Sequence, residues 1–308
     1  MRGMVMSVPK PAARRRWRSG RVLALALLGA AGAVGGLGGC AVLDHKQREW
    51  IFQPSDRTWS GGLAAAEGMA DVWIEYASEV TGAPARLHGL WLPQQRADAP
   101  VLLYLHGARW DVRGSAPRMR RLHDLGFAVL GIDYRGFGRS EGGAPPSEAM
   151  AYEDARAAWR WLGERHPEAR RFVFGHSLGG AIAVDLAAHA SERGDALGGL
   201  MVEGSFPSIP ELVGTYSWRG LPGSLVRPLI TQRFDAAERI GRVKAPVLVV
   251  HGSEDRLIAP ALGRALYERA PEPKRFVLVE GGSHHNTNWV GLDHYRRALP
   301  ELFGLPGP

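Results

Sequence analysis

The chain has 308 residues, 45% of them hydrophobic, which is enough for one large α/β domain or two small ones. Residues 1–39 hold seven of the 38 Lys and Arg residues and no acidic residue, so the rest of the chain has 31 basic and 31 acidic residues. The formal net charge of +7 therefore gives no indication of a nucleic-acid partner, and none is expected. The single cysteine, Cys40, excludes an intrachain disulfide.

Residues 1–39 have the layout of an export signal, because a basic region is followed by the apolar, uncharged residues 22–39. The sequence Leu-Gly-Gly-Cys at 37–40 resembles the bacterial lipobox, which implies that Cys40 becomes the lipidated first residue of the mature protein. Ala41 resembles the residue that follows the cysteine in Gram-negative outer-membrane lipoproteins. We therefore expect an exported protein, anchored by lipid to the outer membrane and facing the periplasm. An ordinary secretory signal and an uncleaved anchor are the alternatives.

Residues 40–70 are predicted to be a linker, in which 41–54 form a polar connector. Short alternating patterns at 71–76 and 87–92 are separated by a turn at 81–84, which predicts an antiparallel hairpin at the start of the folded domain.

The pattern then changes to continuous apolar runs, which are typical of parallel strands covered on both faces. These runs are residues 101–105, 127–132, 171–174, 199–202, 247–250 and 276–279. The helical stretches between and after them are residues 116–125, 147–164, 180–193, 260–269 and 289–302. The alternation predicts an α/β domain over 71–308, with a mostly parallel, doubly wound sheet of about eight strands whose first part is antiparallel. Residues 206–242, rich in Pro, Gly, Trp and Leu, are predicted to form a small lid.

Ser177 stands where the strand at 171–174 gives way abruptly to the helix at 180–193. Glycines two positions before and two after it, Gly175 and Gly179, allow the backbone to approach its neighbours closely. We expect a strained turn that projects the serine hydroxyl at the carboxyl end of the strand. The next amide, that of Leu178, opens a helix whose N-terminus carries partial positive charge.

A serine nucleophile requires a base and a carboxylate that orients the base. Asp255 follows the strand at 247–250, and His284 and His285 follow the strand at 276–279. The order Ser, Asp, His is the order expected for this architecture. The Ala108 amide, just after the strand at 101–105, is positioned to face the Leu178 amide and complete an oxyanion hole.

These motifs resemble the α/β-hydrolase serine esterases and lipases, and the resemblance spans residues 71–302. It rests on Leu-His-Gly at 105–107, Asp-Tyr-Arg-Gly-Phe-Gly-Arg-Ser at 133–140, Gly-His-Ser-Leu-Gly-Gly at 175–180, His-Gly-Ser-Glu-Asp at 251–255 and Gly-Ser-His at 282–284. The small-lid members related to monoacylglycerol lipases and acyl-protein thioesterases are the most similar.

The resemblance implies Ser177 as nucleophile, Asp255 as acid and His284 as base, with the Ala108 and Leu178 amides as the oxyanion hole. His285 remains the alternative base, since a shift of one residue in its loop would exchange the two histidines. Glu203 remains the alternative acid, because it stands where some members of the family carry it.

The expected reaction is hydrolysis of a small acyl ester through an acyl-serine intermediate, with no metal and no organic cofactor. A thioesterase, an acyltransferase and a serine peptidase of the same fold are alternatives, because the same residues serve these reactions. A catalytically idle, lipid-anchored binding protein is the alternative from a different class. The natural substrate, its acyl chain length and the oligomeric state stay open.

Overall fold

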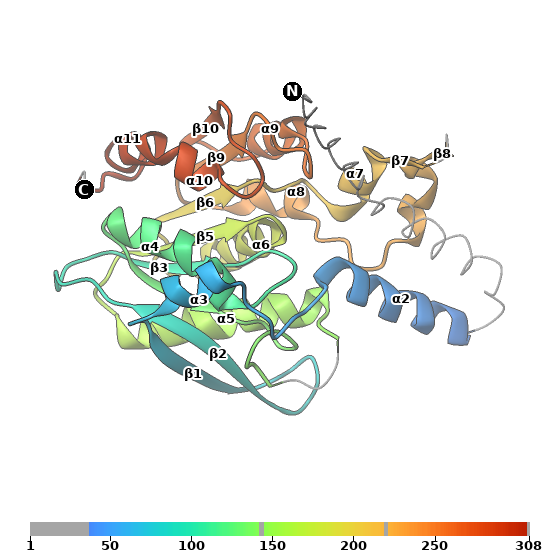
Figure 1. Ribbon diagram of the computed structural model, residues 1–308, viewed down its shortest axis with the longest axis horizontal. Helices are drawn as coiled ribbons and strands as arrows, with labels where there is room; N and C mark the ends of the chain where they lie inside the picture. Colours follow the sequence, from blue (N-terminus) through green and yellow to red (C-terminus); the bar gives the residue numbers. More distant parts are fainter. Residues whose placement is uncertain (1–36, 142–144, 219–220, 307–308) are drawn as a thin grey trace, which may run out of the picture.

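An eight-stranded sheet lies at the centre of the computed structural model, which describes residues 37–141, 145–218 and 221–306 (Figure 1). The strands in spatial order are β1 (Ala70–Ala77), β2 (Pro84–Leu92), β4 (Ala128–Ile132), β3 (Val101–Leu105), β5 (Arg171–His176), β6 (Gly199–Glu203), β9 (Val247–Gly252) and β10 (Lys274–Val279). β2 is antiparallel to both β1 and β4, and every other pair is parallel. The predicted doubly wound sheet with an antiparallel first part is confirmed.

The central strands read as unbroken apolar runs because helices cover both of their faces. In β3, all five residues are buried. Leu103 and Leu105 pack into one core, while Leu102 and Tyr104 pack into a second core on the opposite face. This alternation is the two-residue period of an extended strand.

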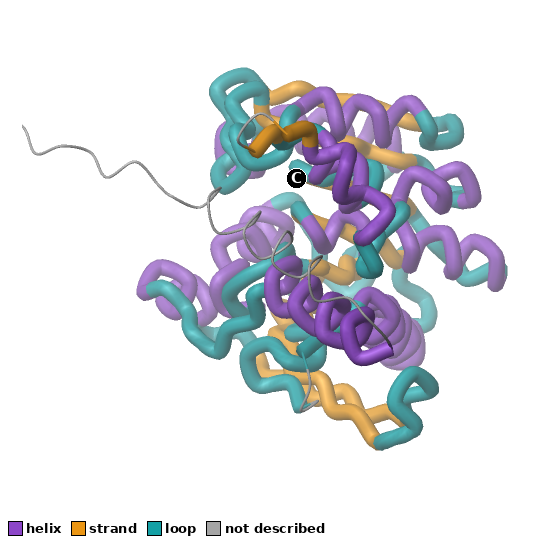
Figure 2. The backbone as a smooth tube through the Cα atoms, turned by 90° about the vertical axis from the view of Figure 1, so that its right-hand side faces the viewer, coloured by secondary structure: helices purple, strands orange, loops and turns teal. Residues whose placement is uncertain are grey.

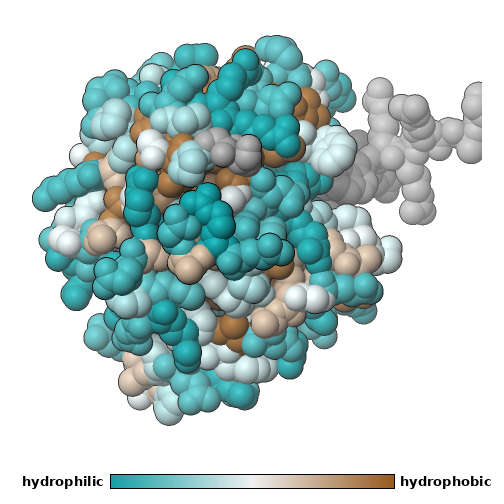
Figure 3. All heavy atoms as spheres, turned by 90° about the vertical axis from the view of Figure 1, so that its left-hand side faces the viewer, coloured by the Kyte–Doolittle hydropathy of each residue, from teal (hydrophilic) through white to brown (hydrophobic). Residues whose placement is uncertain are grey.

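Two helical layers enclose the sheet, and Figure 2 shows strands between helices. The first layer, built on the core of Leu103, contains α5 (Glu148–Arg165), α6 (Leu178–Arg193), α8 (Ala236–Arg239) and α9 (Pro260–Glu268). The second contains α4 (Ala116–Asp124) and α11 (Leu292–Phe303). The face drawn in Figure 3 is largely hydrophilic, with hydrophobic side chains in small scattered areas.

Three helix boundaries near the predicted site differ from expectation. α6 begins at Leu178, directly after Ser177, two residues earlier than predicted. The stretch predicted as one helix over 289–302 is divided at Gly291 into α10 (Thr287–Val290) and α11. A short 3-10 helix, η1 (Val112–Ser115), precedes α4.

The predicted polar connector at 41–54 is wrong, because these residues belong largely to a helix, α2 (Leu37–Phe52). Ile51 and Phe52 at its end are buried in the main core. A short helix, α3 (Ser60–Ala66), was not predicted either. Residues 1–36, which hold most of the predicted export signal, lie outside the described residues. No helix of the described chain has the length and apolar character needed to cross a membrane.

The segment between β6 and β9 contains the residues predicted as a lid. It forms α7 (Ile209–Gly214), a two-stranded ribbon of β7 (Ser217–Trp218) and β8 (Leu221–Pro222), η2 (Gly223–Leu229), α8 and η3 (Ile240–Arg242). Phe206 and Phe234 of this segment are buried in the main hydrophobic core. α2 lies on the same side of the molecule as α7, β7 and β8 (Figure 1).

Candidate active site

Ser177 occupies a strained turn between β5 and α6, with φ 57° and ψ −123°. A β-carbon on Gly175 would lie 2.2 Å from the Gly179 carbonyl oxygen, and one on Gly179 would lie 2.2 Å from that of Leu105. Only glycine fits at either position, so this turn can be as tight as the sequence predicted. The Ser177 amide donates to the Glu203 carbonyl at 2.9 Å, which ties the turn to the end of β6.

His284 stands between Ser177 and Asp255. Its Nε2 is 3.0 Å from Ser177 Oγ, and its Nδ1 is 2.8 Å from Asp255 Oδ2. The other oxygen of Asp255 accepts from the amides of Leu257 at 2.9 Å and Ile258 at 2.8 Å, which fixes the carboxylate. The three residues come from the ends of β5, β9 and β10, where the parallel sheet brings them together.

Asp255 is held as a carboxylate. Burial disfavours its charged form, but hydrogen bonds from His251 and His284 outweigh burial and hold the pKa of Asp255 well below its ordinary value. An ionised, oriented carboxylate favours the His284 tautomer that carries its proton on Nδ1. Nε2 is then free to accept the Ser177 proton.

His285 lies beside His284, with ring centroids 5.4 Å apart, and its side chain is exposed. Within the described chain its ring has no hydrogen bond to Ser177 or Asp255. Of the two candidate bases, the structure therefore brings only His284 to the serine.

The two predicted oxyanion amides flank the serine. A β-carbon on Gly107 would lie 3.0 Å from Ser177 Cβ, so the loop that leads to Ala108 passes directly over the serine. Leu178 is the first residue of α6, a helix of 16 residues. Among the described residues, neither the Ala108 amide nor the Leu178 amide has a hydrogen-bond acceptor. Both N–H groups are therefore available to an anion that forms at Ser177.

Glu203, the alternative acid, is engaged elsewhere. Its side chain is fully buried, and Arg118 of α4 donates to it at 3.0 Å from Nε. The Tyr295 hydroxyl donates to its second oxygen. The structure thus places Asp255, and not Glu203, at the histidine. Sequence reasoning did not find Arg118, because its partner is 85 positions away and nothing local marks the pair.

Two side chains hold the backbone of the loop that carries His284. His176 is buried, and its Nε2 donates to the His284 carbonyl at 2.9 Å. Burial, together with the nearby Arg118 and His284, keeps the pKa of His176 well below its ordinary value, so the ring donates as a neutral imidazole. Arg118 Nη2 lies 3.4 Å from the His285 carbonyl oxygen. Sequence reasoning did not single out His176 as a functional residue. Its position directly before Ser177 was the available signal.

His106, just after β3, and His251, near the end of β9, make local contacts. His106 Nδ1 is 2.7 Å from the Gly107 carbonyl oxygen, and His251 Nε2 is 2.9 Å from that of Ile258. In the part of the chain that the structure describes, no group of three His, Cys, Asp or Glu residues is arranged to hold a metal ion.

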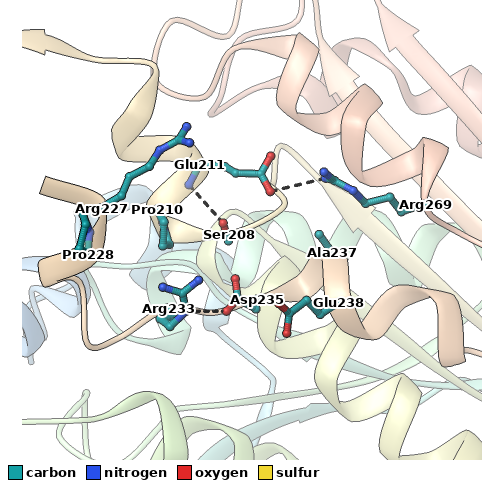
Figure 4. Close-up of a pocket in the computed structure, with 10 residues that line it drawn as sticks. All are labelled: Ser208, Pro210, Glu211, Arg227, Pro228, Arg233, Asp235, Ala237, Glu238 and Arg269. Carbon is teal, nitrogen blue, oxygen red and sulfur yellow. Dashed lines mark hydrogen bonds and ion pairs between the residues drawn. The ribbon is translucent and has the colours of Figure 1, made fainter. Parts of the chain in front are cut away.

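A surface cavity of about 500 Å³ lies beside α7, η2 and α8, apart from the triad (Figure 4). It is lined by Ser208, Pro210, Glu211, Arg227, Pro228, Arg233, Asp235, Ala237, Glu238 and Arg269. Ion pairs join Arg233 to Asp235 at 2.7 Å and Arg269 to Glu211 at 3.6 Å. None of these residues was predicted to act in catalysis.

Comparison with known proteins identifies several similar chains. Residues 96–233 and 219–288 match the Hydrolase_4 family model, described as serine aminopeptidase, S33. An uncharacterized protein of Mycobacterium tuberculosis is 34% identical over 294 residues, covering 93% of this chain and 97% of that protein. Lysophosphatidylserine lipase ABHD12 of Danio rerio is 32% identical over 209 residues, covering 60% of this chain and 54% of that protein.

Solved structures show the same architecture. An alpha-beta hydrolase from Vibrio vulnificus has a TM-score of 0.66 at 19% identity, covering 83% of this chain and 92% of that chain. Esterase Pf2001 of Pyrococcus furiosus has a TM-score of 0.62 at 20% identity, covering 82% and 97%. At such identities the likeness shows the fold alone.

Proposed function

Because the chain belongs to the serine aminopeptidase (S33) family of α/β hydrolases, we propose that it hydrolyses carboxylic esters through an acyl intermediate on Ser177. One observation carries this proposal. A continuous line of hydrogen bonds runs from Asp255 through His284 to the Ser177 hydroxyl. The line ends at the Ser177 hydroxyl oxygen, which a strained turn projects beside the Ala108 and Leu178 amides, neither of which has an acceptor in the described part of the chain.

Each group has a defined step. His284 Nε2 takes the hydroxyl proton as Ser177 Oγ attacks the ester carbonyl, and Asp255 stabilises the imidazolium that forms. The Ala108 and Leu178 amides donate to the tetrahedral oxyanion. His284 then returns the proton to the leaving alcohol. Water, deprotonated by the same nitrogen, releases the acid from the acyl-enzyme.

An ester is proposed as the scissile bond because one of the similar proteins, 32% identical to this chain, bears the name lipase. The family description also names aminopeptidases, so aminoacyl amides are the second candidate substrates. A thioester or acyl transfer would use the same residues, and comparison of leaving groups and acceptors would distinguish them.

The test is hydrolysis of p-nitrophenyl esters, from acetate to palmitate, by a chain that begins at residue 37 and so keeps all of α2. Aminoacyl p-nitroanilides are assayed in parallel. The variants are Ser177→Ala, His284→Ala and His285→Ala. We expect ester hydrolysis to be lost in the first two and kept in the third, with the optimum chain length giving the size of the acyl site.

Labelling with a fluorophosphonate probe separates a hydrolase with an untested substrate from a binding protein. An enzyme that reacts at Ser177 but cleaves no ester would redirect the search to amides and thioesters. A chain that neither cleaves esters nor reacts at Ser177 would contradict the proposal and favour an idle binding protein.

The Leu-Gly-Gly-Cys sequence and the exposure of Cys40 support a second proposal, that Cys40 carries a lipid that anchors the exported protein to the outer membrane. Expression of the full chain in a Gram-negative host with a radiolabelled fatty acid tests it. Label and membrane association are expected in the wild type and absent in Cys40→Ala. Equal membrane association of both would instead favour an uncleaved anchor.

A further inference from the structure

We propose that residues 37–59, the N-terminal strap, are a positioning element of the active site. The strap comprises α2 and the extended segment after it. It precedes residue 96, where the match to the family model begins. Its role is to hold the backbone after Ala108 in the conformation that aims the Ala108 amide at Ser177. The inference rests on the proposed function, which assigns that amide to the oxyanion.

The loop after Ala108 is strained. Arg109 has φ 68° and the adjacent Trp110 has φ 62°, and both are left-handed conformations that residues with side chains rarely adopt. Such a pair persists only where its surroundings hold it, and strain of this kind collects at functional sites. Both side chains are exposed, so packing of Arg109 and Trp110 themselves does not hold the loop.

The strap supplies the missing constraint at Arg109. The Arg109 amide donates to the Phe52 carbonyl at 2.9 Å. The Arg109 side chain donates from Nε to Gln53 Oε1, also at 2.9 Å. Gln53 is itself left-handed, with φ 46°, where the chain leaves α2. These two contacts fix both the main chain and the side chain of Arg109, the residue that follows Ala108.

Further contacts hold the end of the same loop. The Thr58 hydroxyl donates to Asp111 Oδ1, the oxygen that also caps the Gly114 amide. Trp59 Nε1 donates to the Gly114 carbonyl at 3.1 Å. The strap therefore contacts the loop from its first strained residue to the end of η1.

Phe52 makes the strap a rigid support. Its ring is fully buried, with centroids 6.3 Å from Phe137 and 5.6 Å from Phe234. The Ser55 carbonyl accepts from the Gly138 amide at 3.2 Å, which holds the segment after it. The carbonyl that accepts the hydrogen bond from the Arg109 amide therefore belongs to Phe52, whose ring is anchored in the core.

The first half of the strap contacts the segment between β6 and β9, on the side of the molecule that faces the viewer in Figure 2. Gln47 Nε2 donates to the Leu229 carbonyl at 2.7 Å, and Gln47 Oε1 accepts from the Thr231 amide at 2.9 Å. Asp44 Oδ1 accepts from the Thr231 hydroxyl at 2.7 Å and from Gln232 Nε2 at 2.8 Å. One helix therefore joins the end of η2 to the loop after Ala108.

The test compares Phe52→Ala with Phe303→Ala, a matched loss of a buried phenylalanine that packs against Phe172 in the core on the opposite face of the sheet. Kinetics are measured on the best p-nitrophenyl ester, at a temperature where both variants are folded. We expect kcat per folded molecule to fall at least about tenfold in Phe52→Ala, with KM within about twofold, and to change less than about twofold in Phe303→Ala. Equal effects in the two variants would overturn the proposal.

Arg109→Gly separates positioning from stability without disturbing the core. Glycine tolerates φ 68°, so the variant should be at least as stable as the wild type, yet it frees the loop and removes the bond to Gln53. We expect a fall in kcat with no fall in the unfolding temperature, and a smaller fall in Gln53→Ala. Unchanged kcat in Arg109→Gly would contradict a positioning role.

Hydrogen–deuterium exchange gives a readout that does not depend on ester hydrolysis. Amides of 106–114 should exchange faster in Phe52→Ala, while those of 128–132 in β4 should not change. If the wild type hydrolyses no ester, the proposed function fails, and exchange alone decides whether the strap holds the loop. Unchanged exchange in 106–114 would overturn the inference in either case.

Discussion

Two buried Asp–His pairs in this protein differ in what the second ring nitrogen of the histidine faces. His284 joins Asp255 through Nδ1 and presents Nε2 to the Ser177 hydroxyl. His88 joins Asp133 through Nδ1 and Asp71 through Nε2, both at 2.8 Å. The first ring keeps one nitrogen free to accept a proton. The second has a carboxylate at each nitrogen, which raises the pKa of His88 above its ordinary value, so neither nitrogen is available to a nucleophile.

The difference shows that the third group decides whether an Asp–His pair serves chemistry or structure. Asp133 also accepts from the Val112 amide at 2.6 Å, so the His88 pair connects the β1–β2 hairpin to the start of η1. The nearby Ser140 hydroxyl accepts from the His88 amide at 2.8 Å and donates to the Asp133 carbonyl at 2.7 Å, so it is engaged by the backbone and does not pair with the ring. The variants below test this contrast, from the largest expected effect to the smallest.

Ser177→Ala removes the group that makes the first pair reactive. We expect kcat for the best ester to fall by about 10⁴-fold or more, because the remaining amides and histidine cannot form an acyl-enzyme. The unfolding temperature should not fall, since alanine loses only a hydroxyl at a strained position. Steady-state kinetics and thermal unfolding measure both. Residual activity near that of the wild type would mean that another residue is the nucleophile.

Asp255→Asn and Asp71→Asn each replace a carboxylate that contacts a histidine ring, Asp255 at Nδ1 of His284 and Asp71 at Nε2 of His88. The first should lower kcat by about 10³- to 10⁴-fold, because an amide stabilises neither the required tautomer nor the imidazolium. The second should leave kcat within about twofold and lower the free energy of unfolding by about 1 kcal/mol, because it weakens the hydrogen bonds of a half-exposed carboxylate with His88 and Arg139. Urea unfolding followed by kinetics on the folded protein checks both. Equal loss of activity in the two variants would refute the contrast.

Arg118→Lys tests the contact between Arg118 and the His285 carbonyl, which holds the loop that carries His284. Lysine keeps a positive charge opposite Glu203, but a single ammonium cannot also reach the His285 carbonyl. We expect kcat to fall about tenfold through misplacement of His284, with KM nearly unchanged. The rate of fluorophosphonate labelling should fall in parallel. If labelling and turnover both equal those of the wild type, the contact with the loop has no role in catalysis.

His88 predicts a pH dependence of stability. Burial alone would lower its pKa, but the hydrogen bonds that the ring donates to the Asp133 and Asp71 carboxylates outweigh burial and raise the pKa of His88 above its ordinary value. Because the pKa of His88 is higher in the folded than in the unfolded protein, protonated His88 adds to the free energy of unfolding. This contribution is complete below about pH 6.5, the pKa of an unfolded histidine, and is lost as the pH rises through the pKa of His88 in the fold.

The measurement is the free energy of unfolding of the wild type and His88→Gln between pH 6 and 9. Other groups titrate alike in both proteins, so the difference between them isolates His88. We expect this difference to shrink as the pH rises. A difference that grows or stays constant would show that His88 is not protonated in the fold.

Much of the fold could be predicted because its signals are local. Buried parallel strands read as apolar runs, and glycines around Ser177 mark a turn that no other residue permits. The candidate triad followed from the same logic, since residues after parallel strands must meet at one edge of the sheet. The choice between His284 and His285 could not follow from it, because adjacent residues point in different directions and only the path of the loop decides which one reaches Asp255.

The misses share a physical cause. α2 has almost no amphipathic pattern, and its contacts, from Gln47 to Leu229 and from Phe52 to Arg109, join residues far apart in the chain. Arg118 and Glu203 likewise form an ion pair that no local sequence pattern predicts.

The amino-acid sequence by itself determined the order of strands and helices, the strained turn at Ser177 and the strand ends that carry its partners, because each depends on short-range sterics and periodic burial. Only the tertiary structure decided which histidine faces the serine, which acid pairs with that histidine, and which segment holds the loop after Ala108. Those choices depend on hydrogen bonds between distant segments, whose geometry exists only once the sheet has assembled.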